Sequence, residues 1–223
     1  MNIEIHSLVL QPLGTNSYLI GDRAAGQAIL IDPGGDLTAE FAELRPPRIL
    51  QLAENLALRI ELILATHAHW DHVLSSDLIR KETGAPFQAH HLAEPWLQEQ
   101  PESASRMFGA GLRFPAAAAV DRWLTDGPEE ITLGSIQLET RYTPGHAADH
   151  LSFVLHSERA VFSGDSLFAG GIGRWDLPGG DQPQLLASIQ NQLLTLPDDY
   201  RVYPGHGETT TIGHERRSNP FLR

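Results

Sequence analysis

The stretch Thr66-His67-Ala68-His69-Trp70-Asp71-His72 places three imidazoles and a carboxylate in six consecutive positions. Neutral imidazole and carboxylate oxygen are ligands that zinc and iron accept in proteins. An apolar run at 60–65, typical of a buried strand, precedes the stretch, and a helical pattern at 73–83 that ends at Gly84 follows it. The sequence therefore predicts a metal-binding loop between the carboxyl end of a strand and a helix, where open α/β proteins bind ligands.

Composition narrows the classes of protein to consider. The chain has 223 residues, a formal net charge of −12 and no cysteine. The acidic balance argues against nucleic-acid or anionic-membrane partners, because both require a basic surface. Any metal must be held by nitrogen and oxygen atoms, since thiolates are absent. We expect a single domain over residues 1–223. We also expect a cytoplasmic location, because the N-terminus shows no signal-peptide pattern and no apolar run is long enough to span a bilayer.

Hydrophobic periodicity predicts further elements. Short strands are expected over 3–31, helices at 36–44, 48–58 and 184–196, and hairpins over 131–142 and 151–162, followed by a last strand at 201–203. Asp181 is the expected N-cap of the helix at 184–196. The segment 90–123 is irregular in pattern and is expected to be partly helical.

The metal-binding loop is one of several turns that follow a strand and carry a His or Asp. Three further examples are Thr143-Pro144-Gly145-His146, Ser163-Gly164-Asp165 and Pro204-Gly205-His206. Strand ends that carry such side chains predict one site built on loops at the edge of a sheet. Asp32 also follows a strand, in Asp32-Pro33-Gly34-Gly35, but we interpret it as a turn residue because Asx side chains stabilise turns.

The candidate metal ligands are His67, His69, Asp71, His72, His146, Asp165 and His206. Five imidazoles and two carboxylates are more than the roughly three protein ligands of one catalytic zinc ion, so the set predicts two divalent ions. Zn²⁺ is favoured, with Fe or Mn as alternatives. Asp71 and Asp165 are also the candidate catalytic residues. The expected ligand sets are His67, His69 and His146 for the first ion, Asp71, His72 and His206 for the second, and Asp165 as the bridge.

The motifs T-H-A-H-W-D-H, T-P-G-H, S-G-D and P-G-H-G, in this order, resemble those of the metallo-β-lactamase superfamily. The segments 164–168 and 170–181 resemble the glyoxalase II branch, and within it the short bacterial members that lack a C-terminal glutathione-binding domain. The resemblance implies an α/β fold, an αβ/βα four-layer sandwich of two mixed β-sheets flanked by helices, with the metal ions at one edge.

The resemblance also implies an activity, the hydrolysis of a small-molecule thioester such as S-D-lactoylglutathione by a metal-bridging hydroxide. Two ions lower the pKa of a shared water so that hydroxide exists near neutral pH. A thiolate leaves readily because the pKa of a thiol is about 8.5, so no strong general acid is needed.

Arg174 and Trp70 are the candidate substrate-binding residues. Long members of the glyoxalase II branch hold glutathione with basic residues of their additional domain, so the candidates for binding a glycine carboxylate here are Arg174, Arg216 and Arg217. The alternative for Arg174 is a structural ion pair with Asp176 or Asp181. Trp70 is interpreted either as a packing anchor or as a wall of the substrate site.

Other activities on the same fold are alternatives. Sulfur dioxygenases of this fold use one iron ion and carry a G-R-x-D segment, as this chain does at 173–176. They depart from the second-metal pattern near the C-terminus, whereas this chain has Tyr203-Pro204-Gly205-His206-Gly207, which favours hydrolysis over a mononuclear-iron glutathione persulfide dioxygenase. A lactonase or another esterase is a further alternative. β-Lactamase activity is disfavoured by the missing export signal, and a non-enzymatic module would require a closed metal site.

Overall fold

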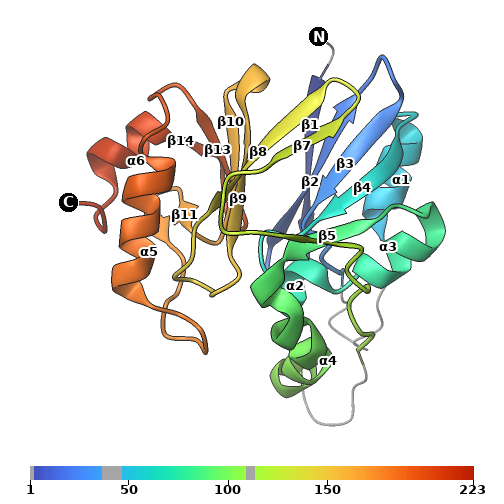
Figure 1. Cartoon of the computed structure of the whole chain (residues 1–223), viewed down its shortest axis with the longest axis horizontal. Coiled ribbons are helices and arrows are strands. Elements are labelled where there is room, and N and C mark those ends of the chain that lie inside the picture. The colour runs from blue at the N-terminus through green and yellow to red at the C-terminus, as the bar shows by residue number, and fades with distance from the viewer. Residues whose placement is uncertain (1–2, 37–46, 109–113) are drawn as a thin grey trace. The chain divides into compact units, whose positions relative to one another are not determined.

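The computed structural model describes residues 3–36, 47–108 and 114–223. The chain divides into two compact units, which are described separately (Figure 1). Unit 1 comprises residues 1–124 and 133–136, and unit 2 comprises residues 125–132 and 137–223. The helix expected over 36–44 lies outside the described residues except for Asp36. Among the described residues, no helix has the length and apolar character that a membrane span requires.

Unit 1 is built on a six-stranded mixed sheet with the order β1-β2-β3-β4-β5-β6. The first three strands form antiparallel pairs, and β3 to β6 run parallel. Parallel neighbours require crossover connections, and helices supply those described here. The strands are β1 (Ile3–Leu10), β2 (Thr15–Asp22), β3 (Gln27–Ile31), β4 (Arg59–Leu64), β5 (Phe87–His90) and β6 (Arg122–Leu124).

The helices of unit 1 contribute apolar side chains to one core. Ile49, Ile79 and Leu97, from three different helices, belong to a buried cluster with Leu30 and Ile63 of the sheet. The helical pattern expected at 73–83 is divided in two, and the irregular segment contains a 15-residue helix. The elements are α1 (Arg48–Asn55), α2 (Trp70–Val73), α3 (Ser76–Thr83), the 3₁₀ turn η1 (His91–Ala93) and α4 (Glu94–Phe108).

Unit 2 contains the second six-stranded mixed sheet, with the order β14-β13-β10-β9-β8-β7. Both predicted hairpins are present, and β10 pairs parallel with β13. A separate small pair, β11 with β12, follows β10. The strands are β7 (Glu130–Leu133), β8 (Ile136–Tyr142), β9 (Leu151–Leu155), β10 (Ala160–Gly164), β11 (Leu167–Phe168), β12 (Gly171–Ile172), β13 (Arg201–Pro204) and β14 (Thr210–Thr211).

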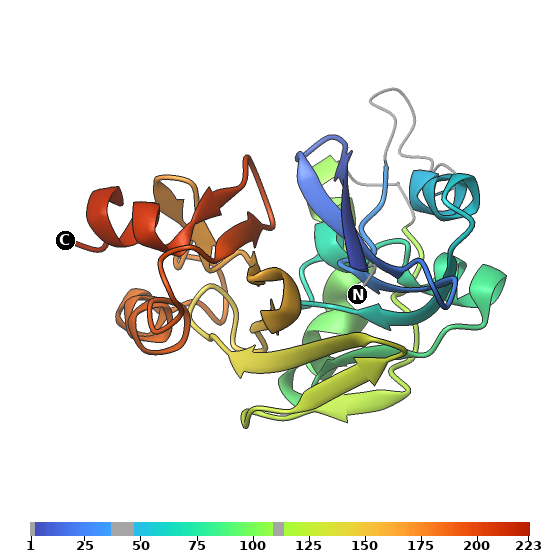
Figure 2. The same cartoon turned by 90° about the horizontal axis from the view of Figure 1, so that it is seen from above.

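Two helices cover one face of the second sheet. Helix α5 (Gln182–Ser188) continues as a π-helical turn η3 (Ile189–Leu193), and α6 (Ile212–Ser218) follows β14. Leu185 and Ile212 belong to the same buried cluster as Val161 and Val202 of the strands. Figure 2 shows both helices on the same side of β13 and β14. As the sequence predicts, the Asp181 side chain caps α5 by accepting a hydrogen bond from the backbone N–H of Gln184.

Each sheet brings the ends of two neighbouring parallel strands together. In unit 1, β3 and β4 pair through Ile31 and Leu64, their last residues. In unit 2, β10 and β13 pair through Gly164 and Pro204, also their last residues. Loops that leave such adjacent ends start side by side, which is how residues far apart in the sequence come to share one edge of a sheet.

Candidate metal centre

The four candidate ligands of unit 1 lie together where β4 ends. His67 Nε2 is 3.0 Å from His69 Nδ1, and the rings of His67 and His72 are 4.2 Å apart between centroids. His72 Nε2 lies 3.4 Å from Asp71 Oδ2. With bonds of about 2.0–2.1 Å, two ligand atoms of a tetrahedral ion are about 3.3–3.4 Å apart, so this spacing fits atoms that share an ion.

Asp32 holds this loop from the neighbouring strand end. Its carboxylate accepts hydrogen bonds from the backbone N–H of Thr66 at 2.7 Å, from the Thr66 hydroxyl at 2.9 Å and from His72 Nδ1 at 2.9 Å. The side chain is 1% exposed, and the residue has a left-handed φ of 55°, which Asp tolerates better than most residues. Asp32 is therefore more than the turn residue that the sequence suggests, because it fixes the orientation of His72.

Two further contacts position Asp71. The hydroxyl of Thr15 donates to Asp71 Oδ2 at 2.8 Å. Gly34 lies so close to the backbone of Asp71 that a Cβ on Gly34 would overlap the carbonyl oxygen of Asp71. The close approach explains the glycine of the Asp32-Pro33-Gly34-Gly35 turn and sets the position of the Asp71 backbone.

In unit 2, one carboxylate oxygen faces two imidazoles. Asp165 Oδ2 is 3.5 Å from His146 Nε2 and 3.5 Å from His206 Nε2. The chain reaches this position through a register shift between Phe162 and Gly164 and a left-handed Gly164 with φ 49°. Such bulges re-aim side chains at strand ends. The N–H of Gly205 donates to the carbonyl of Gly164 at 2.7 Å, which ties the two strand ends together.

The hydrogen bonds of three imidazoles identify their protonated nitrogens. A carboxylate or carbonyl oxygen can only accept, so His72 Nδ1 donates to Asp32 and His146 Nδ1 donates to the carbonyl of Arg174 at 2.8 Å. The Thr66 hydroxyl donates to Asp32, so it accepts from His67 Nδ1 at 3.0 Å. In the neutral rings, Nε2 is then the unprotonated nitrogen. This arrangement, with Nδ1–H donated to oxygen, is typical of metal-binding histidines.

Two glycines of unit 2 also stand where the backbone of another segment leaves no room for a side chain. A Cβ at Gly173 would overlap the carbonyl oxygen of Asp165 and lie 3.1 Å from His146 Nδ1. At Gly145, which has φ 127°, a Cβ would overlap the backbone of Leu185 in α5. These two close approaches fix the loops that carry the candidate ligands of unit 2.

The candidate substrate residues have structural partners. Arg174 donates to both oxygens of Asp176, at 2.9 and 3.0 Å, which is the ion pair considered from the sequence. The guanidinium holds the pKa of the Asp176 carboxyl below its ordinary value, and hydrogen bonding to Asp176 raises the pKa of Arg174. Trp70 is 7% exposed, as expected of a packing residue. A substrate-binding role for Arg174 or Trp70 stays a prediction.

The helix α6 holds the loop between β11 and β12. Glu215, which is fully buried, accepts from the N–H of Gly170 at 3.0 Å and from the Thr210 hydroxyl at 2.7 Å. Asn219 donates to Glu215 at 2.8 Å and to the carbonyl of Gly171 at 3.0 Å. We refer to Glu215 and Asn219 as the α6 latch. The latch fixes the loop that follows Phe168, whose ring packs edge-on against His206.

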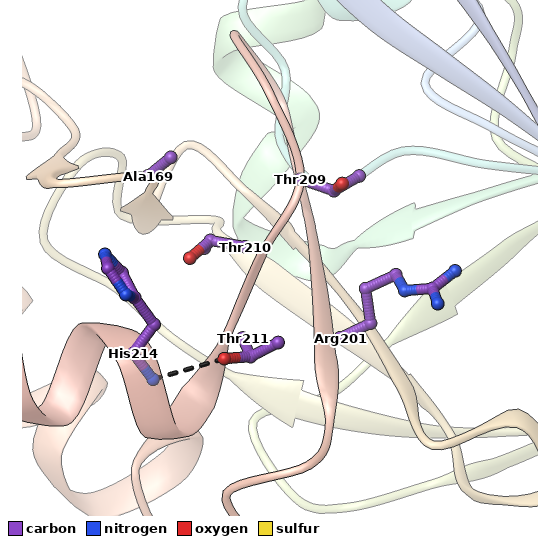
Figure 3. A pocket seen from close by; sticks show the side chains of 6 residues that line it. All are labelled: Ala169, Arg201, Thr209, Thr210, Thr211 and His214. Atoms are coloured by element: carbon purple, nitrogen blue, oxygen red, sulfur yellow. Dashed lines mark hydrogen bonds between the residues drawn. The ribbon is translucent and has the colours of Figure 1, made fainter.

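A cavity of about 450 Å³ lies beside the hairpin of β13 and β14 (Figure 3). Arg201 and His214 extend in different directions from it, while His214 donates its backbone N–H to the Thr211 hydroxyl at 3.2 Å. Ligand sites usually have polar groups that converge on one point. We therefore assign no ligand to this cavity, which is lined by Ala169, Arg201, Thr209, Thr210, Thr211 and His214.

Comparison with known proteins decides the family. The profile described as the metallo-β-lactamase superfamily matches residues 10–206. The chain belongs to the metallo-β-lactamase superfamily. Metallohydrolases belong to this superfamily, and its fold binds divalent metal ions. The predicted α/β fold class is confirmed, since two large mixed sheets with helices are present and the similar solved structures have this fold. The roles of the candidate ligands and the single domain stay predictions.

Three relatives are similar over nearly the whole chain. Hydroxyacylglutathione hydrolase GloC of Haemophilus influenzae is 40% identical over 223 residues, which are 100% of this chain and 98% of that protein. The structure of BLEG-1 B3 metallo-β-lactamase is 37% identical with a TM-score of 0.86, covering 98% and 99% of the two chains. TTHA1623 in a di-iron-bound form is 37% identical with a TM-score of 0.82, covering 97% and 100%.

The sequence reasoning missed the residues that orient the candidate ligands. Asp32, like the candidate ligand Asp165, is a carboxylate that follows a strand, so the sequence could have identified it as a residue of the candidate site. Thr15 and His150 have no such signal, because their partners Asp71 and Asp165 become apparent only when the strands pair.

Proposed function

We propose that the protein is a metal-dependent hydrolase that cleaves a thioester such as S-D-lactoylglutathione and uses two divalent ions, with Zn²⁺ favoured. Membership of a metallohydrolase superfamily supports the reaction class. Full-length similarity to hydroxyacylglutathione hydrolase GloC supports the thioester. The proposed ligands are those predicted from the sequence, and the proposed location is the cytoplasm.

The observation that carries the proposal is the position of Asp165. Its Oδ2 lies 3.5 Å from the Nε2 atoms of both His146 and His206. Since His146 Nδ1 donates to a carbonyl, the neutral ring presents an unprotonated Nε2 to this oxygen. Two acceptors cannot hydrogen-bond to each other, so a proton on one of the two groups or a shared cation would make this close approach favourable. A metal-binding superfamily favours the cation, and one oxygen near two imidazoles fits a bridge between two ions.

Unit 1 shows the same pairing independently. His72 Nδ1 donates to Asp32, and its Nε2 lies 3.4 Å from Asp71 Oδ2. An imidazole and a carboxylate again present acceptors to each other. His67 Nε2 and His69 Nδ1, which are 3.0 Å apart, add a further pair of candidate ligand atoms. The donor set of nitrogen and oxygen atoms suits zinc, iron and manganese in different degrees.

Two ions would be held by the five candidate histidines together with Asp71 and Asp165, and when bound they would make hydroxide available near neutral pH and favour attack on the thioester carbonyl. Asp71 and Asp165 position the nucleophile as carboxylate acceptors. Asp32, through His72, and Thr15, through Asp71, keep the ligand side chains in orientation. Hydrolysis would exchange the carbon–sulfur bond of the thioester for a carbon–oxygen bond from water, and the thiolate would leave without a strong general acid because a thiol pKa is about 8.5.

Metal content and one matched pair of variants test the proposal. We expect the purified protein to retain close to two ions per chain. Asp165→Asn should lower thioester turnover by more than about 100-fold with little change in melting temperature, because even residues that only support metal ligands contribute 10–100-fold. Asp199→Asn is the control, since this exposed carboxylate of unit 2 pairs with Arg159 at the surface. Normal turnover by Asp165→Asn would contradict the assignment of the bridge.

Assays with a panel of substrates distinguish the thioesterase from the alternative activities. The panel should include β-lactams, because the similar structure BLEG-1 is named a B3 metallo-β-lactamase and covers 98% of this chain. Lactones test the esterase alternative. A single tightly held iron ion together with oxygen uptake on glutathione persulfide would replace the hydrolase with a persulfide dioxygenase.

A further inference from the structure

His150 connects two of the loops that carry candidate ligands in unit 2. It is fully buried and stands four residues after His146. Its Nε2 accepts a hydrogen bond from the backbone N–H of Asp165 at 3.0 Å. Its Nδ1 lies 2.9 Å from the Thr143 hydroxyl and 3.2 Å from the Ser166 hydroxyl. A single side chain therefore contacts both the Thr143–His146 loop and the Asp165 loop.

The contacts determine the protonation of the ring. The backbone N–H of Asp165 can only donate, so Nε2 of His150 is the unprotonated nitrogen. The proton of the neutral ring is then on Nδ1, which donates to a hydroxyl. The Ser166 hydroxyl donates to the Thr143 carbonyl at 3.3 Å and can accept from Nδ1, as can the Thr143 hydroxyl.

The strand pattern explains why Asp165 needs this partner. β10 ends at Gly164, after a register shift and with a left-handed backbone, so the next N–H has left the regular hydrogen-bonding of the sheet. A buried N–H without an acceptor is costly, and the ring of His150 supplies the acceptor. The same ring also lies edge-on to His146, with 6.1 Å between centroids.

We propose that His150 is a positioning residue that sets the placement of the Asp165 carboxylate relative to His146 and thereby the affinity for metal. This inference rests on the proposed function only in that Asp165 and His146 bind metal; it does not depend on the substrate. Residues that orient metal ligands typically change metal affinity 10–100-fold when they are replaced, and we expect an effect of this size.

Two amide variants isolate the acceptor at Nε2. The Oε1 atom of His150→Gln reaches the place of Nε2 and can accept from Asp165, whereas His150→Asn places its amide near Nδ1 and leaves Asp165 without an acceptor. The two side chains have the same functional group and differ by one methylene. His150→Leu removes both polar contacts and is a third variant if it folds.

The experiment titrates the Zn²⁺-loaded protein with a chromophoric chelator and records melting temperatures alongside. We expect His150→Gln to retain zinc within about threefold of the wild type, and His150→Asn to release it 10–100-fold more readily. If both variants hold zinc like the wild type, or lose it equally, the positioning role is wrong, whatever their melting temperatures. A wild type that binds two zinc ions but hydrolyses no thioester contradicts the proposed substrate alone. A wild type that binds no metal contradicts both proposals.

Discussion

Replacing Asp32 by Asn tests whether this carboxylate organises the loop of unit 1. The Asp32 carboxylate accepts from two N–H groups, those of the Thr66 backbone and His72 Nδ1, and from the Thr66 hydroxyl. Asn has one acceptor oxygen and one donor amide in the same space. In one orientation, its NH₂ group faces the Thr66 N–H, which then loses its acceptor. In the other, it faces His72 Nδ1, which can accept from it only if the ring proton moves to Nε2, the nitrogen proposed to bind metal.

An orphaned buried donor costs about 1–3 kcal/mol, so Asp32→Asn should lower the free energy of unfolding by about that amount. Asp32→Ala should lower it by about 2–6 kcal/mol, because both N–H donors lose their acceptor. A further cost of about 1–2 kcal/mol arises because Ala tolerates the left-handed φ of 55° poorly. The metal affinity should fall about 10–100-fold in Asp32→Asn, since His72 loses its orientation.

The assay is urea unfolding of the metal-free proteins followed by far-UV circular dichroism, with chelator competition on the loaded proteins. Asp199→Asn serves as the control for loss of one carboxylate at the surface. An Asp32→Asn variant with the urea midpoint and the metal affinity of the wild type would refute the reasoning, because the three hydrogen bonds could then not determine the loop.

Two further predictions concern stability. The Ser135 hydroxyl and backbone N–H hold the pKa of Asp22 below its ordinary value of 3.8, so this stabilisation is present above pH 3.8 and is lost as the pH falls through the lower folded value. Asp22→Asn should therefore lower the urea midpoint at neutral pH, and its difference from the wild type should shrink as the pH falls below 3.8; a difference that does not change with pH, or no difference at neutral pH, would contradict this. Gly173→Ala should destabilise the protein by about 1–3 kcal/mol and weaken metal retention, because its Cβ would overlap the Asp165 carbonyl. Gly127→Ala is its control, since the nearest atom to that Cβ is 3.9 Å away, and equal stability of the two variants would contradict the predicted overlap.

Local signals were sufficient for most of the fold. Alternating and apolar runs located most strands of the two large sheets, and Gly84 and Asp181 marked helix ends that the structure confirms. The long helix α4 was harder to recognise, because Pro101 stands inside it. β6, β14 and α6 were missed, since strands of three and two residues and a seven-residue helix have too little periodicity to be recognised.

For the candidate site, the sequence predicted the metal ligands but not the residues that orient them. Histidines and aspartates at strand ends identify the candidate ligands, because their chemistry is visible in the sequence. The residues that orient them are not visible in this way. Asp32 meets Thr66 across 34 residues, and His150 meets Asp165 only because β9 and β10 pair. Such partners depend on strand register, which a single sequence specifies only indirectly.

The α6 latch has a practical consequence for handling this protein. Glu215 and Asn219 hold the loop at Gly170 and Gly171 from helix α6 and the residue after it, and Asn219 stands four residues before Arg223. A shortened chain that ends before Asn219 would lose the hydrogen bonds from this side chain to the Gly171 carbonyl and to Glu215, and with them part of the support of the loop that follows Phe168. Production of the protein for kinetic work should therefore retain Asn219 and the residues after it.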